Sequence, residues 1–111
     1  MTVSEAAAKL NLRPIAGSKG LETEINGVYL GDLLSWVMGR AKERNIWITI
    51  QGHVNVAAVA LLTGVSCVIV AEGAEIGGEL AAKADAEGIP LFASDMDVFT
   101  LVKLIVGLGI A

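Results

Sequence analysis

The fold is decided by the stretch Cys67-Val68-Ile69-Val70-Ala71-Glu72-Gly73. Its first four residues are apolar with no polar alternation, which is typical of a strand that is covered on both faces in a parallel sheet. Glu72 and Gly73 then end the run with a turn. A buried parallel strand needs a crossover connection to the next strand, so this stretch predicts a helix directly after the turn.

The same unit occurs three more times along the chain. An apolar run meets a turn containing Gly, Asp or Ser in the stretches Val28-Tyr29-Leu30-Gly31-Asp32, Trp47-Ile48-Thr49-Ile50-Gln51-Gly52-His53 and Pro90-Leu91-Phe92-Ala93-Ser94-Asp95. Helix-like segments separate the four units. Strands that alternate with helices predict an α/β domain, with a mostly parallel sheet of about four to five strands and helices on both faces.

Local patterns divide the chain into ten expected elements. They predict helices over about 3–10, 32–40, 54–62, 75–87 and 98–108, and strands over 12–16, 25–30, 46–50, 65–70 and 89–93. We expect Asp32 to cap the second helix and Asp95 or Asp97 to cap the last, because a carboxylate accepts hydrogen bonds from free N–H groups at a helix start. Pro14 confines the first strand to an edge of the sheet or to a strand start.

Length and composition predict one domain, residues 1–111. Its apolar residues are more numerous than a domain of this size can bury in its own core. Hydrophobic residues make up 54% of the chain and charged residues 18%, against a typical apolar share of about 45–50%. The segment 98–108 is apolar on nearly all sides, and such a helix should be covered all round. We therefore expect a homodimer, because a twofold interface is the commonest way to cover such a surface.

The most apolar segments predict the core. We expect it to contain Val56, Val59, Leu61, Val68, Ile69 and Val70. Cys67 lies in the same apolar run, which favours a small buried residue over a metal ligand. As the single cysteine, it excludes an internal disulfide.

Charge and segment lengths exclude several classes of partner. The net charge is −4 and the chain has no basic run, which argues against nucleic acid and against an anionic membrane surface. The amino-terminal residues do not resemble a signal peptide, and no apolar run free of charge reaches the length of a membrane span. We therefore expect a cytoplasmic protein.

The polar residues that follow the four strands form the candidate site. Because the carboxyl ends of parallel strands meet at one edge of a sheet, where ligands usually bind, these residues should lie near one another. The nominated ligand-binding residues are Asp32, Gln51, Gly52, His53, Gly73 and Asp95. Their carboxylates disfavour a bare polyanion, so a neutral or zwitterionic metabolite is as plausible as a nucleotide.

His53 is the only histidine, and it allows three interpretations. It can hydrogen-bond the start of the next helix, it can contact a ligand, or it can act as a general base beside Asp32 or Asp95 in a small enzyme. A lone histidine does not make a zinc site without other strong ligands. Asp95 and Asp97 form a D-x-D pair that could hold Mg²⁺ or cap a helix. GxGxxG and GxxxxGK[ST] motifs are absent, so we assign no catalytic residue, no metal ligand and no required cofactor.

Across nearly its whole length, the chain resembles the DRTGG domain family. The likeness includes Asn26-Gly27-Val28-Tyr29 before the Gly31-Asp32 turn, Thr49-Ile50-Gln51-Gly52-His53, and Glu87-Gly88-Ile89-Pro90-Leu91. The name-giving residues are partly kept: Asp32 matches the Asp, Leu33 replaces the Arg, and Ala71-Glu72-Gly73 replaces Thr-Gly-Gly. Arg suits bidentate phosphate contact, so its loss argues against a phosphate site.

The resemblance implies a small α/β regulatory module, related in fold to the N-terminal domain of HPr kinase/phosphorylase. Such domains occur beside CBS domains in some inorganic pyrophosphatases, in some phosphotransacetylases and as free-standing modules. It implies no catalytic activity, a dimeric assembly and a partner enzyme that the module regulates. Three functions stay open: a ligand-sensing module, a small enzyme using His53 with a carboxylate, and a purely structural dimerisation or docking domain.

Overall fold

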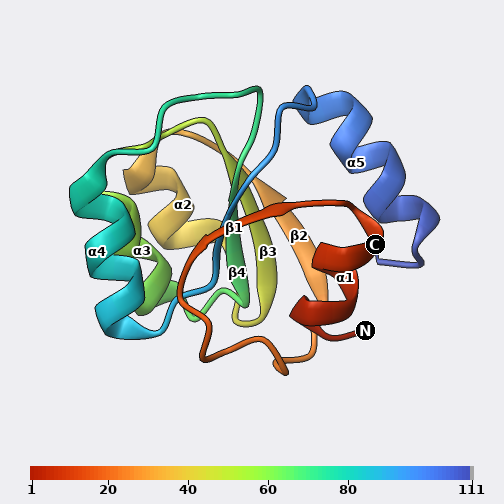
Figure 1. The fold of residues 1–111 in the computed structure, drawn as a ribbon, viewed down its shortest axis with the longest axis horizontal. Coiled ribbons are helices and arrows are strands. Elements are labelled where there is room, and N and C mark those ends of the chain that lie inside the picture. Colours follow the sequence, from red (N-terminus) through yellow and green to blue (C-terminus); the bar gives the residue numbers. More distant parts are fainter. Residues whose placement is uncertain (111) are drawn as a thin grey trace.

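One five-stranded sheet organises residues 1–110, the part of the chain that the computed structural model describes (Figure 1). Its strands are β1 (Arg13–Ala16), β2 (Gly27–Leu30), β3 (Asn45–Thr49), β4 (Cys67–Val70) and β5 (Leu91–Ala93). The helices are α1 (Val3–Lys9), α2 (Leu34–Arg40), α3 (Asn55–Thr63), α4 (Gly78–Glu87) and α5 (Val98–Gly107). The α/β class and the number of strands agree with the sequence-based prediction.

The strand order is β1-β5-β4-β3-β2, and the four strands from β2 to β5 are parallel. β4 lies in the middle, as its unbroken apolar run predicts. β1 is antiparallel to β5 at one edge of the sheet, with an irregularity between Pro14 and Ala16. This edge position confirms the prediction from Pro14, which lacks the N–H that an inner strand would need.

Helices cover both faces of the sheet, as predicted. α2, α3 and α4 lie side by side on one face, and α1 and α5 lie on the other (Figure 1). Successive residues of β4 point to opposite faces, so Val68 and Val70 pack under α2–α4 whereas Ile69 packs under α1 and α5. Every residue of β3, β4 and β5 is buried.

One predicted core residue is exposed. Leu61 is 52% exposed, whereas Val56 and Val59 are buried as expected. The inner side of α3 carries Val56, Val59 and Ala60, and Leu61 lies about 100° further round the helix. Because this helix is apolar on nearly all sides, its sequence does not indicate which side faces the sheet.

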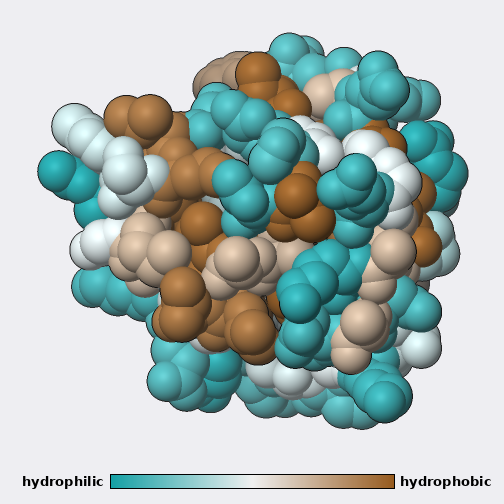
Figure 2. Space-filling view, turned by 90° about the vertical axis from the view of Figure 1, so that its left-hand side faces the viewer, coloured by the Kyte–Doolittle hydropathy of each residue, from teal (hydrophilic) through white to brown (hydrophobic). Residues whose placement is uncertain are grey.

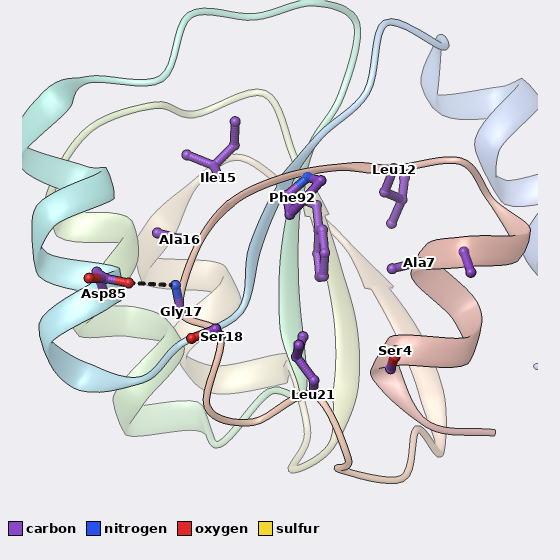
Figure 3. A pocket seen from close by; sticks show the side chains of 12 residues that line it. Ser4, Ala7, Leu12, Ile15, Ala16, Gly17, Ser18, Leu21, Asp85 and Phe92 are labelled. Atoms are coloured by element: carbon purple, nitrogen blue, oxygen red, sulfur yellow. Dashed lines mark hydrogen bonds between the residues drawn. The ribbon is translucent and has the colours of Figure 1, made fainter.

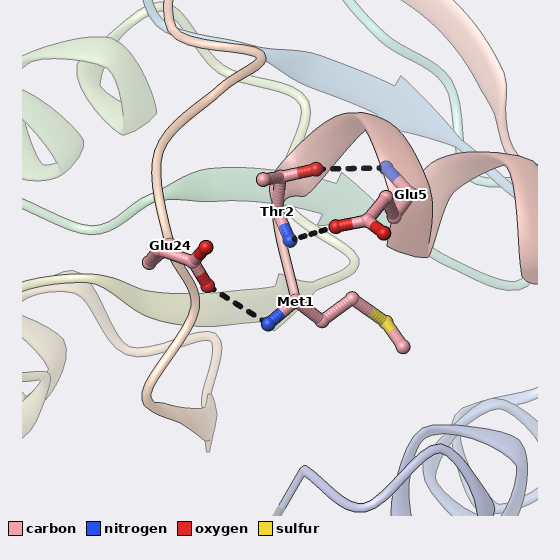
Figure 4. Close-up of polar contacts among 4 residues, drawn as sticks. All are labelled: Met1, Thr2, Glu5 and Glu24. Atoms are coloured by element: carbon pink, nitrogen blue, oxygen red, sulfur yellow. Dashed lines mark hydrogen bonds and ion pairs between the residues drawn. The ribbon is translucent and has the colours of Figure 1, made fainter.

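Several helix ends follow the local sequence patterns. Thr2 Oγ1 accepts from Glu5 N, and Glu5 Oε1 accepts from Thr2 N, so the expected capping box starts α1 (Figure 4). Gly64 and Gly88 end α3 and α4 in the left-handed conformation. α4 starts at Gly78 rather than near Glu75, because the preceding residues form a loop that bonds to the β3–α3 connection.

Truncation of Ile69 should remove a large share of the stability. Ile69 is fully buried in β4, and Ile69→Ala should cost about 2–5 kcal/mol because it leaves a cavity in the core. Ile50→Ala is the matched control, because Ile50 is an exposed residue just after β3, and it should change the free energy of unfolding by less than about 1 kcal/mol. Urea denaturation of both variants tests this, and equal losses would contradict the placement of β4 at the centre.

Candidate functional site

The carboxyl ends of β2, β3, β4 and β5 open on one edge of the sheet, which we call the rim. It forms the upper side of the sheet in Figure 1. The structure brings all six nominated residues to this edge; five are exposed and Gly52 is half-buried. They are, however, held in three separate sets of contacts along the rim.

The first set contains Asp32, which does not cap α2 as predicted. α2 begins at Leu34, and its cap residue Leu33 has an extended backbone and no side-chain hydrogen bond. Asp32 Oδ1 instead accepts from Thr49 Oγ1 and from Ile50 N, both at 2.8 Å. The prediction was wrong because the chain stays extended past Asp32, which brings the carboxylate over the end of β3.

Loss of the Asp32 carboxylate should loosen this end of the sheet. Asp32→Ala leaves Thr49 Oγ1 and Ile50 N without their acceptor, and we expect it to lower the free energy of unfolding by about 1–3 kcal/mol. Asp95→Ala removes an exposed rim carboxylate of the same type and should cost less than about 0.5 kcal/mol. Urea denaturation measures both values, and equal losses would show that the Asp32 bonds contribute nothing.

The second set of contacts contains Gly52 and His53, and Gln51 connects it to Asp32 in the first set. Gln51 Nε2 donates to the Asp32 carbonyl oxygen at 3.3 Å. The Gly52 carbonyl accepts from Gly77 N at 3.0 Å, and a Cβ on Gly52 would lie 1.8 Å from the Glu75 carbonyl oxygen. Gly52 is therefore required where the loop after β3 touches the loop after β4.

His53 hydrogen-bonds the start of α3, which was one of its three interpretations. Its Nδ1 accepts from Asn55 N at 3.1 Å, so the neutral ring carries its proton on the exposed Nε2. Within residues 1–110, ion pairs join the Met1 amino group to Glu24 and Lys83 to Glu87. In that part of the chain, His53 is not ion-paired with a carboxylate, whereas a close pair would have favoured the enzyme interpretation.

The third set contains Gly73 and Asp95. Gly73 and Glu72 both have positive φ, of 65° and 61°, and their N–H groups donate to the carbonyls of Ser94 and Met96. A Cβ on Gly73 would lie 3.4 Å from Asp95 Oδ1. The N–H groups of this turn are therefore used within the protein and do not form an anion site.

Asp97, rather than Asp95, caps the last helix. Its Oδ1 accepts from Thr100 N at 2.7 Å, and this bond lowers the pKa of the Asp97 carboxyl group. The cap therefore stabilises the fold above the ordinary pKa of an aspartate, and this contribution is lost as the pH falls through the lower folded value. Residues 1–110 contain no group of three or more acidic, His or Cys side chains arranged to hold a metal ion.

A small cavity of about 260 Å³ lies between the starts of α3 and α4. It is lined by Gly52, His53, Val54, Gly77, Gly78, Glu79 and Leu80. No side chain caps α4, so the first N–H groups of this helix have no side-chain acceptor. Sequence reasoning missed the α4 side of the cavity because it placed Gly77 and Gly78 inside a helix; the adjacent pair of glycines was the available sign of a helix start.

A larger cavity of about 470 Å³ lies away from the rim, against β1 (Figure 3). Its lining is mainly apolar and comes from α1, β1 and the loop after β1. Asp85 is the one charged residue in the lining, and its Oδ1 accepts from Gly17 N at 3.1 Å. No sequence pattern pointed to this cavity, because it forms where segments far apart in the chain meet.

Comparison with known proteins shows a similarity of fold. No family model and no curated protein matches the chain. A similar solved structure is that of the CBS and DRTGG domains of the regulatory region of Clostridium perfringens pyrophosphatase, complexed with the activator diadenosine tetraphosphate. The two agree with a TM-score of 0.77 at 19% sequence identity, over 95% of this chain and 46% of that chain. The chain thus has a DRTGG-like fold and spans about half the length of that neighbour.

Within residues 1–110, none of the helices has the length and apolarity needed to cross a bilayer.

Proposed function

We propose that the chain is a non-catalytic regulatory module that binds a small metabolite or nucleotide at the rim and acts, as a homodimer, on a partner enzyme. The fold supports a regulatory role, because the neighbour with the same fold belongs to the regulatory region of an enzyme. That regulatory region is complexed with a nucleotide activator, which makes nucleotides the first class to test.

The observation that carries the ligand-binding part is the cavity between α3 and α4. It joins the exposed His53, whose Nε2 can donate, to the uncapped start of α4. Glu79 lines the same cavity, and Glu75 lies in the loop before it. These carboxylates favour a neutral or zwitterionic ligand, so a phosphate group would need a bound cation to screen its charge.

The enzyme alternative is less well supported than the sensing function. Two of its three candidate groups already have structural tasks, because Asp32 Oδ1 holds the end of β3 and His53 Nδ1 holds the start of α3. The third, Asp95, lies beside Gly73 in the separate set of contacts at the end of β5. The docking alternative is supported by exposed apolar residues such as Trp36, Leu62 and Phe99, and it does not exclude ligand binding.

A ligand titration followed by NMR tests the proposal. Adenine nucleotides and common central metabolites should be added with and without Mg²⁺. We expect saturable shifts at the amides of Gly52, His53, Gly73 and Gly77. We also expect about tenfold weaker binding in His53→Ala, since one hydrogen bond is lost. Asp85→Asn changes the cavity at β1 and serves as the matched control that should bind normally.

Two results would contradict the proposal. Saturable shifts confined to the cavity at β1, and abolished in Asp85→Asn, would refute the rim as the binding place. Conversion of any compound in the panel, lost in His53→Ala, would show that the protein is an enzyme.

A further inference from the structure

The two edges of the sheet differ in how well they are protected from another strand. β1 carries Arg13 and Pro14 and is irregular next to Pro14. β2, from Gly27 to Leu30, has no proline, no charged residue and a regular register with β3. Natural proteins usually protect an exposed edge strand with charges, prolines or bulges. The bare edge of β2 therefore suits pairing with another strand.

One side of α2 lies over this bare edge. In α4, Ala84 is buried and the next residue, Asp85, faces β1, because its carboxylate accepts from Gly17 N. α2 and α4 occupy equivalent places in the first and third of three βαβ units that share one face of the sheet. Each residue advances about 100° round a helix. Val37 is the buried residue of α2, so Trp36, one position before it, faces away from β1 and toward the outer edge of β2.

The same argument places one side of α5 over the edge from the other face of the sheet. Leu104 lines a cavity together with Leu10 and Arg13, so this side of α5 faces α1 and β1. Ile105, the next residue, is buried. Val106 therefore lies on the opposite side of the helix and faces the β2 edge.

Apolar side chains thus flank the bare strand on both faces. The exposed ones are Leu30 (45%), Leu33 (61%), Trp36 (56%), Phe99 (71%) and Val106 (57%). Leu33 is the cap residue directly before α2. Phe99 shares the Val106 side of α5 at a spacing of seven residues. Arg40 covers part of the Trp36 ring, with its guanidinium carbon 4.0 Å from the ring centroid.

The charges at the two ends of this edge have opposite signs. Asp32 lies at the rim end. At the other end, Arg40 ends α2, and Lys42 and Arg44 outnumber Glu43 in the segment that joins α2 to β3. Glu22 and Glu24 precede β2 at this end, and Glu24 is paired with the Met1 amino group. Two copies related by a twofold axis would run antiparallel along the edge, so Asp32 of each copy would approach Lys42 and Arg44 of the other. This surface is therefore complementary to itself.

We propose that a second copy of this chain pairs along the outer edge of β2, with the apolar sides of α2 and α5 packed against those of its partner. This inference rests on the homodimer in the proposed function and gives it a location. β2 has four residues, so its backbone supplies few hydrogen bonds, and the apolar side chains provide most of the contact. This single interface would cover both the exposed Trp36 and the exposed apolar side of α5.

A second apolar surface provides the control. Figure 2 shows apolar side chains gathered over the α2–α4 layer, where Leu62 on the outer side of α3 is 72% exposed. In sedimentation experiments at micromolar concentration, the wild-type chain should have twice its 11.5 kDa mass. Trp36→Glu should weaken the dimer about tenfold or more. Leu62→Glu, at a more exposed residue, should leave the dimer unchanged.

Chemical crosslinking gives an independent readout. Cys67 is fully buried, and burial raises the pKa of its thiol to about 12, so it should not react. With a short bis-maleimide, Leu30→Cys should yield a covalent dimer and Leu62→Cys should not. A monomeric wild-type chain, or a dimer that Leu62→Glu dissociates and Trp36→Glu does not, would overturn the inference. NMR titration of Trp36→Glu reports separately on the rim, so failure of the edge interface is distinguishable from failure of ligand binding.

Discussion

Val68→Asp should abolish folding of this domain. Val68 is 1% exposed in β4, with β3 on one side and β5 on the other. The substitution would bury a carboxylate without a partner, and the effective cost of burying an ion is several kcal/mol. A domain of this size has a total stability of only about 5–15 kcal/mol, so the folded state should no longer be populated.

The control carries the same carboxylate on the surface. Leu62→Asp changes a residue that is 72% exposed on α3, and it should keep the circular dichroism spectrum and cooperative unfolding of the wild type. Both variants should be compared by circular dichroism and urea denaturation. A soluble Val68→Asp protein with a cooperative transition would show that β4 is not the central strand.

Gly17→Ala should also destabilise the domain strongly. Gly17 has a φ of 76°, and a Cβ there would lie 1.8 Å from the Ile89 carbonyl oxygen. The conformational strain alone costs about 1–3 kcal/mol, and relief of the overlap would move the backbone just before β5. The shift would also stretch the bond from Gly17 N to Asp85 Oδ1. We therefore expect the free energy of unfolding to fall by an amount at the upper end of that range or beyond it.

Gly39→Ala is the matched control, because it makes the same change where there is space. Gly39 lies within α2, and a Cβ there would meet nothing within 4 Å. Alanine in a helix is more stable than glycine by roughly 0.5–1 kcal/mol, so this variant should unfold at a higher temperature than the wild type. If Gly17→Ala were as stable as Gly39→Ala in calorimetry, the close packing of the β1–β2 connection on Ile89 would be wrong.

The sequence was sufficient to predict the main features of the fold. The unbroken apolar run of β4 indicated a central parallel strand, and Pro14 indicated an edge, because each depends on the local chemistry of a few residues. The orientation of α3 could not be predicted, since a helix that is apolar all round has no distinct inner side. Leu61 was for that reason placed in the core, although it is exposed.

The contacts at the candidate site were harder to predict than its location. Parallel strands place their following loops on one edge, so the rim followed from the order of the elements. The bonds from Asp32 to Thr49 and Ile50 connect two loops, and no local pattern specifies which partner a carboxylate will choose. The late start of α4 at Gly78 also depends on the distant carbonyl of Gly52.

Native mass spectrometry of the protein purified from its source tests the central claim most directly, because it reports the oligomeric state and any retained ligand together. We expect a species of twice the 11.5 kDa chain mass, carrying an additional small mass that denaturation releases. The mass of the released compound would identify its chemical class. A species at 11.5 kDa with no added mass would contradict a ligand-binding homodimer.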